Sequence, residues 1–276
     1  MKKKVLGWNI NQRSGMGNGI PQLVIDELID QDADIIVLTE IYKDDTIEYF
    51  WAEMDRAGYA HAITQNTGTN EVAILWRRNM FELLAVDDSV VTKAENNNPN
   101  LLLVDLLDEK GQKLTIVGYR IRIVDYGKRA EELEIVVKKA NEKKNPVLMI
   151  TDSNNLRREP IEQRWNLSVM DEILAAKDFE RHTPGGQSIF AEKADRGYAY
   201  EFAEDHIVTR KIKEVVLGRY DRDFVYRDKA AYPWGKDFQI YGEKNGSRLS
   251  IQPGFPDHAI IMKYTVDIPK AVVDRF

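Results

Sequence analysis

The sequence predicts a mixed α/β fold in which helices cover β-sheets, and three observations lead to this prediction. Short apolar runs rich in β-branched residues recur along the chain, segments with helical periodicity lie between some of them, and no linker-like stretch interrupts the pattern. The 276 residues are 43% hydrophobic and 30% charged, which is typical of a globular protein with a large core. We therefore expect a single domain over residues 1–276.

The apolar runs have the length of buried strands. They lie at Val5–Ile10, Ile35–Leu38, Val72–Trp76, Leu101–Leu106, Leu114–Val117, Val147–Ile150, Ile207–Val208 and Ala259–Met262. The region from Tyr59 to Ile121 holds several consecutive strands, and the order strand, helix, strand at the start of the chain recurs loosely in the second half.

Four segments are predicted to be helices. The clearest is Gly127–Lys144, because its apolar residues recur at helical spacing on one face and Lys and Glu occupy the other. Those apolar residues are Ala130, Leu133, Val136, Val137 and Ala140. A second helix runs from Pro21, which suits the first helical position, to Asp30. The other two are Asp45–Arg56 and Arg164–Ala176.

Composition excludes several classes of protein. The chain has no cysteine, so disulfides, thiolate metal sites and cysteine nucleophiles are excluded, and a metal must bind to oxygen or histidine. The net charge of −6 argues against a protein that coats nucleic acid by charge alone, but it allows an enzyme that binds a phosphate transiently. No signal-peptide core follows the first lysines and the apolar runs are strand-sized, so we expect a cytoplasmic protein without stable membrane association.

Polar residues end many of the predicted strands, which is where α/β sheets collect their functional sites. Each has an ordinary structural explanation when taken alone, as a turn, a helix cap or a solvated loop. In chain order they are Trp8-Asn9 with Asn11, Thr39-Glu40, Gly118-Tyr119, Asp152-x-Asn154, Asp205 and Asp257-His258.

Taken together and in this order, these residues make the chain resemble the endonuclease/exonuclease/phosphatase superfamily, the DNase I-like and exonuclease III-like phosphoesterases. The resemblance covers nearly the whole chain. It implies a four-layer αββα sandwich of two packed mixed β-sheets flanked by helices. It also implies hydrolysis of a phosphodiester by in-line attack of water, assisted by Mg²⁺, for which Mn²⁺ can substitute.

The resemblance also implies a metal site. Glu40 is the carboxylate that anchors Mg²⁺, a hard cation that prefers oxygen ligands, and Asn9 offers a neutral oxygen beside it. Asn11 can serve in the same place as Asn9 or contact the substrate, and Asp257 approaches the metal indirectly.

The catalytic roles follow from the same resemblance. Asp152 is the base that takes a proton from the attacking water, and Asn154 orients that water or donates to the phosphate. His258 contacts the scissile phosphate, and Asp205 holds the ring of His258 in the correct tautomer. Tyr119 hydrogen-bonds the phosphate as negative charge develops.

Two arginines are assigned to substrate binding. Arg122, three residues after Tyr119, is either a bidentate phosphate clamp or a salt-bridged surface residue. Strict strand alternation puts residues 119 and 122 on opposite faces unless the strand ends or bulges there. Arg157 follows the Asp152-x-Asn154 motif and ranks below Arg122 as a phosphate contact.

Thr39 and Thr151 replace the family's usual Gln and Gly, and neither change removes a predicted ligand. Pro256 replaces its usual Ser, which removes a hydroxyl and a backbone donor next to Asp257. We expect an endonuclease or exonuclease acting on DNA or RNA. Two alternatives stay open: an enzyme for a small phosphate ester of the inositol-phosphate or sphingomyelinase type, for which Arg122 with Arg120 would suffice as a clamp, and a phosphate-binding module without turnover.

Overall fold

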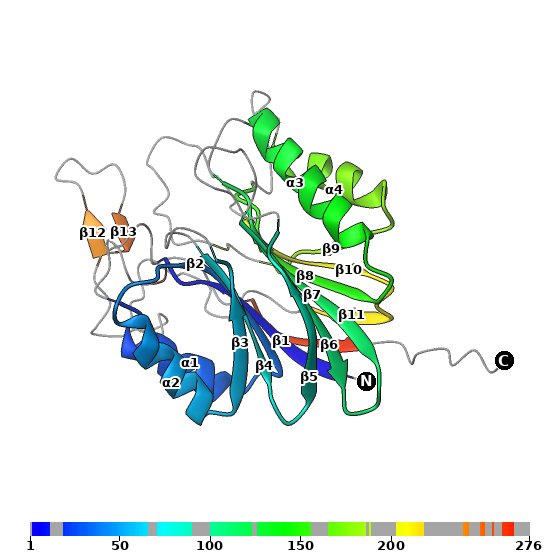
Figure 1. The fold of residues 1–276 in the computed structure, drawn as a ribbon. Coiled ribbons are helices and arrows are strands. Elements are labelled where there is room, and N and C mark those ends of the chain that lie inside the picture. The colour runs from blue at the N-terminus through cyan, green and yellow to red at the C-terminus, as the bar shows by residue number, and fades with distance from the viewer. Residues whose placement is uncertain are drawn as a thin grey trace.

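Two six-stranded β-sheets pack face to face, and a pair of helices covers the outer face of each in the computed structural model (Figure 1). The structure describes residues 2–11, 19–65, 71–89, 100–122, 126–155, 165–185, 188, 203–217, 240–242, 249–251, 256 and 261–267. Within these residues the layers follow the order helices, sheet, sheet, helices. The predicted αββα sandwich is therefore confirmed.

The first sheet is mixed, with one parallel pair, β1 and β2, among antiparallel neighbours. Its strands in spatial order are β11 (Glu214–Val216), β14 (Ile261–Asp267), β1 (Lys2–Asn9), β2 (Ile35–Ile41), β4 (Glu71–Arg77) and β3 (Tyr59–Ile63).

The second sheet is mixed in the same way, with β7 and β8 as its parallel pair. Its strands in spatial order are β5 (Phe81–Asp87), β6 (Asn100–Asp108), β7 (Lys113–Arg120), β8 (Val147–Asp152), β10 (Asp205–Arg210) and β9 (Glu180–His182). A separate two-stranded ribbon joins β12 (Ile240–Gly242) to β13 (Leu249–Ile251).

The four predicted helices are all present with slightly different ends. They are α1 (Gln22–Gln31), α2 (Ile47–Arg56), α3 (Tyr126–Asn141) and α4 (Leu167–Ala175). Pro21 is the residue just before α1 rather than its first helical residue, and Asn166 caps α4 by accepting hydrogen bonds from the backbone N–H groups of residues 168 and 169. None of the helices in the described part of the chain is long and apolar enough to cross a membrane.

Strand alternation divides the apolar side chains among three cores. On β7, for example, Ile116 faces the other sheet, whereas Val117 and Tyr119 face α3 and α4. On β2, Val37 faces the other sheet and Leu38 faces α1 and α2. Each sheet is therefore buried on both faces, and a polar side chain at a strand end can lie between the sheets.

The two parallel pairs place four strand ends at one edge of the sandwich. In each pair a helix connects the strands, α1 between β1 and β2 and α3 between β7 and β8, so both strands of a pair end at the same side. Because β1 and β2 pack against β8, and β2 also packs against β7, the carboxyl ends of all four strands converge (Figure 1).

Gly118 on β7 lets the two sheets approach closely just before this edge. A Cβ atom added there would lie 2.6 Å from Cγ1 of Val72 and 2.8 Å from Cγ1 of Val37, both on the opposite sheet. Both valines are buried, and a β-branched side chain has little freedom to move aside. The spacing of the sheets at this point therefore requires glycine.

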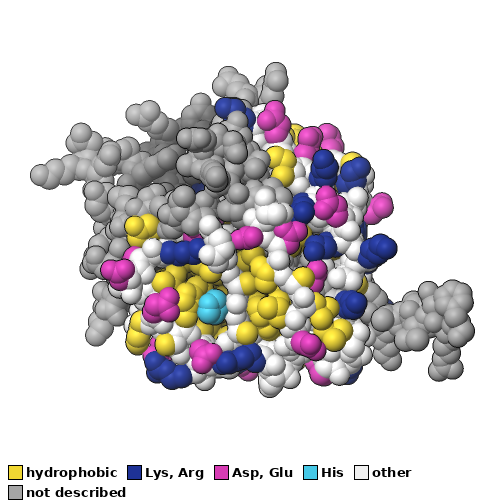
Figure 2. Space-filling view, viewed as in Figure 1, with side chains coloured by type: hydrophobic (Ala, Val, Ile, Leu, Met, Phe, Trp, Pro, Cys, Tyr) yellow, Lys and Arg dark blue, Asp and Glu magenta, His cyan; other side chains and the backbone are white. Residues whose placement is uncertain are grey.

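The face in Figure 2 carries apolar side chains together with charges of both signs. Acidic and basic residues are interspersed around the apolar area rather than gathered into a basic stripe. Leu83, Leu84 and Val86 of the edge strand β5 are among the large exposed apolar residues, each being 41–45% exposed.

Replacing Gly118 by alanine should lower the free energy of unfolding by about 1–3 kcal/mol, because the new methyl group forces two packed valines apart. Denaturant unfolding of the purified variant measures this. Gly111→Asn is the control, because Gly111 has nothing within 4 Å of an added Cβ and its φ of 74° is one that asparagine tolerates. Equal stability of Gly118→Ala and the wild type would show that the sheets are not held this closely.

Candidate functional site

A hydrogen bond joins the two sheets at the edge where the parallel pairs end. The side-chain amide of Asn9, the last residue of β1, donates through Nδ2 to Oδ2 of Asp152, the last residue of β8, at 2.9 Å. Oδ1 of Asn9 accepts a hydrogen bond from the backbone N–H of Asn11 at 2.9 Å. Asn9, Asn11 and Asp152 are all buried, so the predicted metal ligand and the predicted base are in direct contact.

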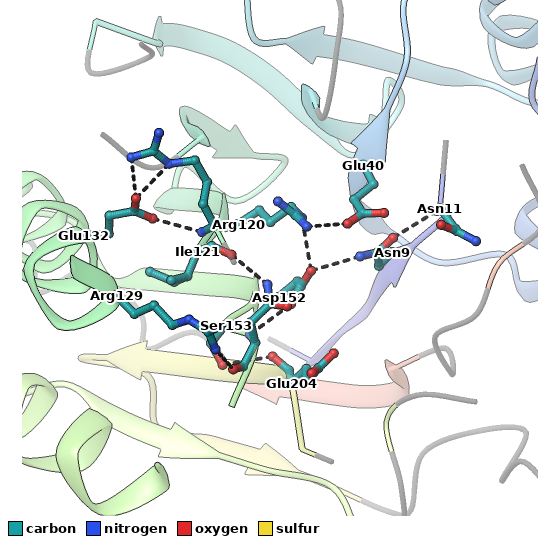
Figure 3. A network of polar contacts seen from close by, with 12 residues as sticks. Asn9, Asn11, Glu40, Arg120, Ile121, Arg129, Glu132, Asp152, Ser153 and Glu204 are labelled. Carbon is teal, nitrogen blue, oxygen red and sulfur yellow. Dashed lines mark hydrogen bonds and ion pairs between the residues drawn. The ribbon is translucent and has the colours of Figure 1, made fainter. Parts of the chain in front are cut away.

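Glu40 reaches the same place because β2 has an irregularity next to it. The pairing of β2 with β4 shifts between Leu38 and Ile41, and Glu40 has a φ of 57°. Leu38 and Ile41 both pack in the core beneath α1 and α2, so the extra residue turns the Glu40 side chain toward the other sheet. Its carboxylate points at the cluster formed by Asn9 and Asp152 (Figure 3).

Arg120 lies between the two carboxylates. Its Nη2 is 2.5 Å from Oε1 of Glu40, and its Nε is 3.4 Å from Oδ2 of Asp152 (Figure 3). Burial alone would lower the pKa of Arg120, but the charges of Glu40 and Asp152 and the hydrogen bond to Glu40 raise that pKa above its usual value. The guanidinium is therefore a permanent positive charge that ties an acid of one sheet to an acid of the other.

The chain turns sharply after β8, and its turn is held by hydrogen bonds on both sides. The backbone N–H of Asn154 donates to Oδ1 of Asp152 at 3.1 Å, and Nδ2 of Asn154 donates to the carbonyl of Ile121 at 2.7 Å. Asn154 has a φ of 51°, a left-handed conformation that asparagine tolerates well. Arg129 of α3 donates from Nη1 to the Asn154 carbonyl at 2.8 Å.

Two further contacts fix this turn from the side of β10 and α4. The backbone N–H and the hydroxyl of Ser153 both donate to the carbonyl of Glu204, at 2.6 and 2.9 Å. The indole N–H of Trp165, just before α4, donates to the Ser153 carbonyl at 2.9 Å. Asp205, the first residue of β10, pairs directly with Asp152 across the ladder and is 3% exposed, so a second acid lies beside the predicted base.

Arg122 is bound by an acid of α3. Its Nε donates to Oε1 of Glu132 at 2.7 Å and its backbone N–H donates to Oε2 of Glu132 at 2.9 Å, while Glu132 itself is fully buried. Of the two interpretations of Arg122, phosphate clamp or salt-bridged surface residue, this arrangement is the salt bridge, but with a partner, Glu132, that is buried. Arg122 and Glu132 thereby anchor the start of the segment that leads from β7 into α3.

Tyr119 lies away from the cluster. Its side chain is fully buried in the core between the second sheet and α3 and α4, on the opposite face of β7 from Arg120. Burial raises the pKa of the Tyr119 hydroxyl above its usual value. β7 keeps its regular alternation to its end, so the residue that the structure brings to the acids is Arg120 and not Tyr119.

Three predicted site residues, Arg157, Asp257 and His258, lie outside the described residues. The residues that the structure brings together are Asn9, Asn11, Glu40, Asp152, Asn154 and Asp205.

Sequence reasoning named Arg120 only as a helper of Arg122 and did not name Glu132 or Arg129. A signal for Arg120 exists, because it continues the register of Leu114, Ile116 and Gly118, the positions of β7 that face the other sheet. Glu132 and Arg129 carry no such signal, since their partners belong to a different element.

The donor atoms at this edge suit Mg²⁺. Glu40 brings a carboxylate and Asn9 an amide oxygen, and Mg²⁺ prefers such hard oxygen ligands. Three acids, Glu40, Asp152 and Glu204, interact with the single positive charge of Arg120. These four described groups together therefore carry a net negative charge. The described residues contain no group of three or more acidic or histidine side chains that could hold a metal ion by themselves.

No protein-family model and no curated protein matches this sequence. Solved structures do match it over nearly the whole chain. An endonuclease/exonuclease/phosphatase family protein from Bacteroides thetaiotaomicron superposes with a TM-score of 0.62 at 14% identity, covering 97% of this chain and 95% of that one.

Two further matches have more specific names. TDP2 of D. rerio, in complex with a single-strand DNA product, has a TM-score of 0.59 at 15% identity and 96% and 98% coverage of this chain and of TDP2. The mannosyl-6-phosphatase Bt3783 of B. thetaiotaomicron VPI-5482 has a TM-score of 0.60 at 15% identity, with the same two coverages. The chain thus has the fold of the endonuclease/exonuclease/phosphatase proteins, and the fold that the resemblance implied is confirmed.

Asn154→Ala should lower the free energy of unfolding by about 2–4 kcal/mol, because it leaves the Ile121 carbonyl without its donor and puts alanine in a left-handed conformation. Asn154→Gly loses the same hydrogen bond without the backbone cost, so it should be roughly 1 kcal/mol less destabilised. Chemical denaturation of the three proteins gives the order wild type, glycine, alanine. An alanine variant at least as stable as the glycine variant would contradict the left-handed assignment.

Proposed function

We propose that this protein is a divalent-cation-dependent phosphoesterase that hydrolyses a phosphodiester by in-line attack of water. The observation that carries the proposal is the convergence of Asn9 and Glu40 from one sheet with Asp152 and Asp205 from the other. The likeness of fold to phosphatases and to TDP2 supports the same reaction class. We also propose that the 276 residues form a single catalytic domain.

The chemistry of a phosphodiester explains why such residues belong together. The phosphate anion repels a nucleophile, so an enzyme must neutralise charge, deprotonate water and hold a straight line of attack. Glu40 and Asn9 would hold Mg²⁺, with Mn²⁺ as a substitute, and a bound ion supplies positive charge that offsets the charge developing on the phosphate.

The other residues act on the water and the phosphate. Asp152 accepts the proton of the attacking water, and the donors on its two oxygens, Asn9 Nδ2 and the Asn154 N–H, fix the orientation of its carboxylate. Asn11, beside Asn9, faces the substrate. Asp205 orients His258, which contacts the scissile phosphate with Asp257 beside it, as the resemblance implies.

The position of β14 supports a place for His258 at this edge. β14 runs antiparallel to β1, and its first residue, Ile261, pairs with Gly7 near the end of β1. Asp257 and His258 lie four and three residues before Ile261 in the sequence. Arg157, a few residues after Asn154, is proposed as a further phosphate contact, and Arg122 contributes only where substrate can compete with Glu132.

We propose a nucleic-acid phosphodiester as the substrate. TDP2 shares this fold and is described with a single-strand DNA product. Because the net charge is −6, we expect transient binding of one phosphate rather than tight binding along a duplex.

A small phosphate ester is the second candidate, favoured by two observations. The net negative charge counts against binding along many phosphates, whereas a small phosphate ester needs only a local clamp, and a structural neighbour is a mannosyl-6-phosphatase. A substrate panel of single-stranded DNA, RNA, bis-p-nitrophenyl phosphate, inositol phosphates and sugar phosphates separates the two candidates.

Glu40→Gln should slow hydrolysis of whichever panel substrate is turned over by on the order of a thousandfold, because it removes the charge that holds the cation. Initial rates with Mg²⁺ and with EDTA measure this. Asp34→Asn is the control, since Asp34 lies just before β2, at the opposite end of that strand from Glu40. Turnover that survives both EDTA and Glu40→Gln would disprove the metal-dependent mechanism.

His258→Ala should abolish turnover while leaving the unfolding midpoint close to that of the wild type, because its proposed role is contact with the phosphate rather than support of the core. Paired rate and thermal-unfolding measurements test this. Retained turnover in a folded His258→Ala protein would remove His258 from the mechanism.

A further inference from the structure

Arg120 is paired with the two carboxylates that the proposed function uses for different purposes. Its side chain is 7% exposed, and it contacts Glu40 of the first sheet and Asp152 of the second. Arg122, by contrast, is paired with a single acid, Glu132. Arg120 instead spans the proposed metal ligand and the proposed base (Figure 3).

This position makes the guanidinium a competitor of the divalent cation. Oε1 of Glu40 lies 2.5 Å from Arg120 Nη2, so the same oxygen cannot also bind a metal ion without repulsion between two positive groups. Arg120 is the last residue of β7 and is buried there, on the face of the strand that is turned toward the other sheet.

A guanidinium released from Glu40 would stay within the site, where a bound phosphate can become its new partner. Arginine binds phosphate oxygens through two parallel hydrogen bonds, and in a net-negative site a phosphate needs a cation beside it. Glu40 and Asp152 hold Arg120 close to where the proposed reaction places the phosphate.

We propose that Arg120 is an exchangeable counter-ion: it neutralises Glu40 and Asp152 in the cation-free protein, is released from Glu40 when that carboxylate takes a divalent cation, and then binds the phosphate. This inference rests on the proposed function. It makes cation binding and phosphate binding mutually dependent, since each ligand favours the same position of one side chain.

The experiment measures Mg²⁺ affinity by calorimetry with and without inorganic phosphate, for the wild type, Arg120→Lys and Arg120→Gln. Lysine keeps the charge but cannot span two carboxylates. We expect Mg²⁺ alone to bind several-fold more tightly to Arg120→Gln than to the wild type, and Arg120→Lys to show a smaller gain because it keeps the competing charge. We expect phosphate to tighten Mg²⁺ binding at least fivefold in the wild type and by less than half that factor in both variants.

Arg77→Lys is the matched control, because Arg77 pairs with Asp32 at the opposite end of the first sheet. This variant should bind Mg²⁺ as the wild type does, both with and without phosphate. Thermal unfolding without ligand shows which variants fold. The effect of phosphate on Mg²⁺ binding by the wild type tests the proposal even if no variant folds. If phosphate does not tighten Mg²⁺ binding in the wild type, or if Arg120→Lys binds both ligands as the wild type does, the exchange is wrong.

Glu40→Gln separates this failure from failure of the proposed function. If Mg²⁺ binds the wild type but not Glu40→Gln, the metal site stands whatever Arg120 does. If Glu40→Gln binds Mg²⁺ as well as the wild type does, the proposed metal site is wrong, and the exchange that depends on it is wrong as well.

Discussion

The close approach of the two sheets at Gly118 determines whether the rest of the site can exist. Asn9 and Asp152 come from different sheets and are joined by one hydrogen bond of 2.9 Å, and Arg120 joins Glu40 to Asp152 across the same gap. Short polar side chains can make such contacts only if the backbones behind them are near. Gly118 lies two residues before Arg120. Because it has no Cβ, its backbone packs directly against Val37 and Val72 of the other sheet, and this contact sets the distance between the sheets.

A site built this way has to bury charges, and burial is costly unless each charge is matched. Glu40 and Asp152 are each 1% exposed and Arg120 is 6% exposed, so none of them is solvated as in water. Replacing such a set by apolar residues is often neutral or stabilising, which means that ion pairs of this kind are weak evidence for a role in stability. Their better explanation is orientation: the carboxylates are aimed at one point, as the proposed reaction on a phosphate requires.

The strands and helices could be predicted because they depend on patterns within single elements, whereas the αββα layers were predicted from the family resemblance, which uses the order of polar strand ends along the whole chain. The apolar face of α3 and the polar ends of β1, β2 and β8 can be recognised without knowing any neighbour. Partners contributed by other elements were not predictable. Nothing in the residues around Arg122 indicates that Glu132, ten positions later, would bind it.

Tyr119 and Glu40 show that the face on which a side chain lies also could not be predicted from the sequence. Regular alternation on β7 turns Tyr119 toward α3 and α4, whereas an irregularity on β2 turns Glu40 toward the acids. A sequence pattern indicates which residue type lies at a strand end, but the local backbone determines which face of the sheet its side chain is on. At the end of β7, Tyr119 faces the helices, and the neighbouring Arg120 faces the acids.

Three of the six non-glycine residues with positive φ in the described part of the chain lie at this edge. Asn11, Glu40 and Asn154 have φ angles of 53°, 57° and 51°, and all three lie at strand ends in the site. Asparagine tolerates this conformation, but a glutamate there is uncommon, and glycine would relieve the backbone cost. The cost is accepted at Glu40 because the left-handed turn is what aims its carboxylate between the sheets. A strained residue that is also acidic, buried and paired with a cation is explained by chemistry at this edge better than by any need of the fold.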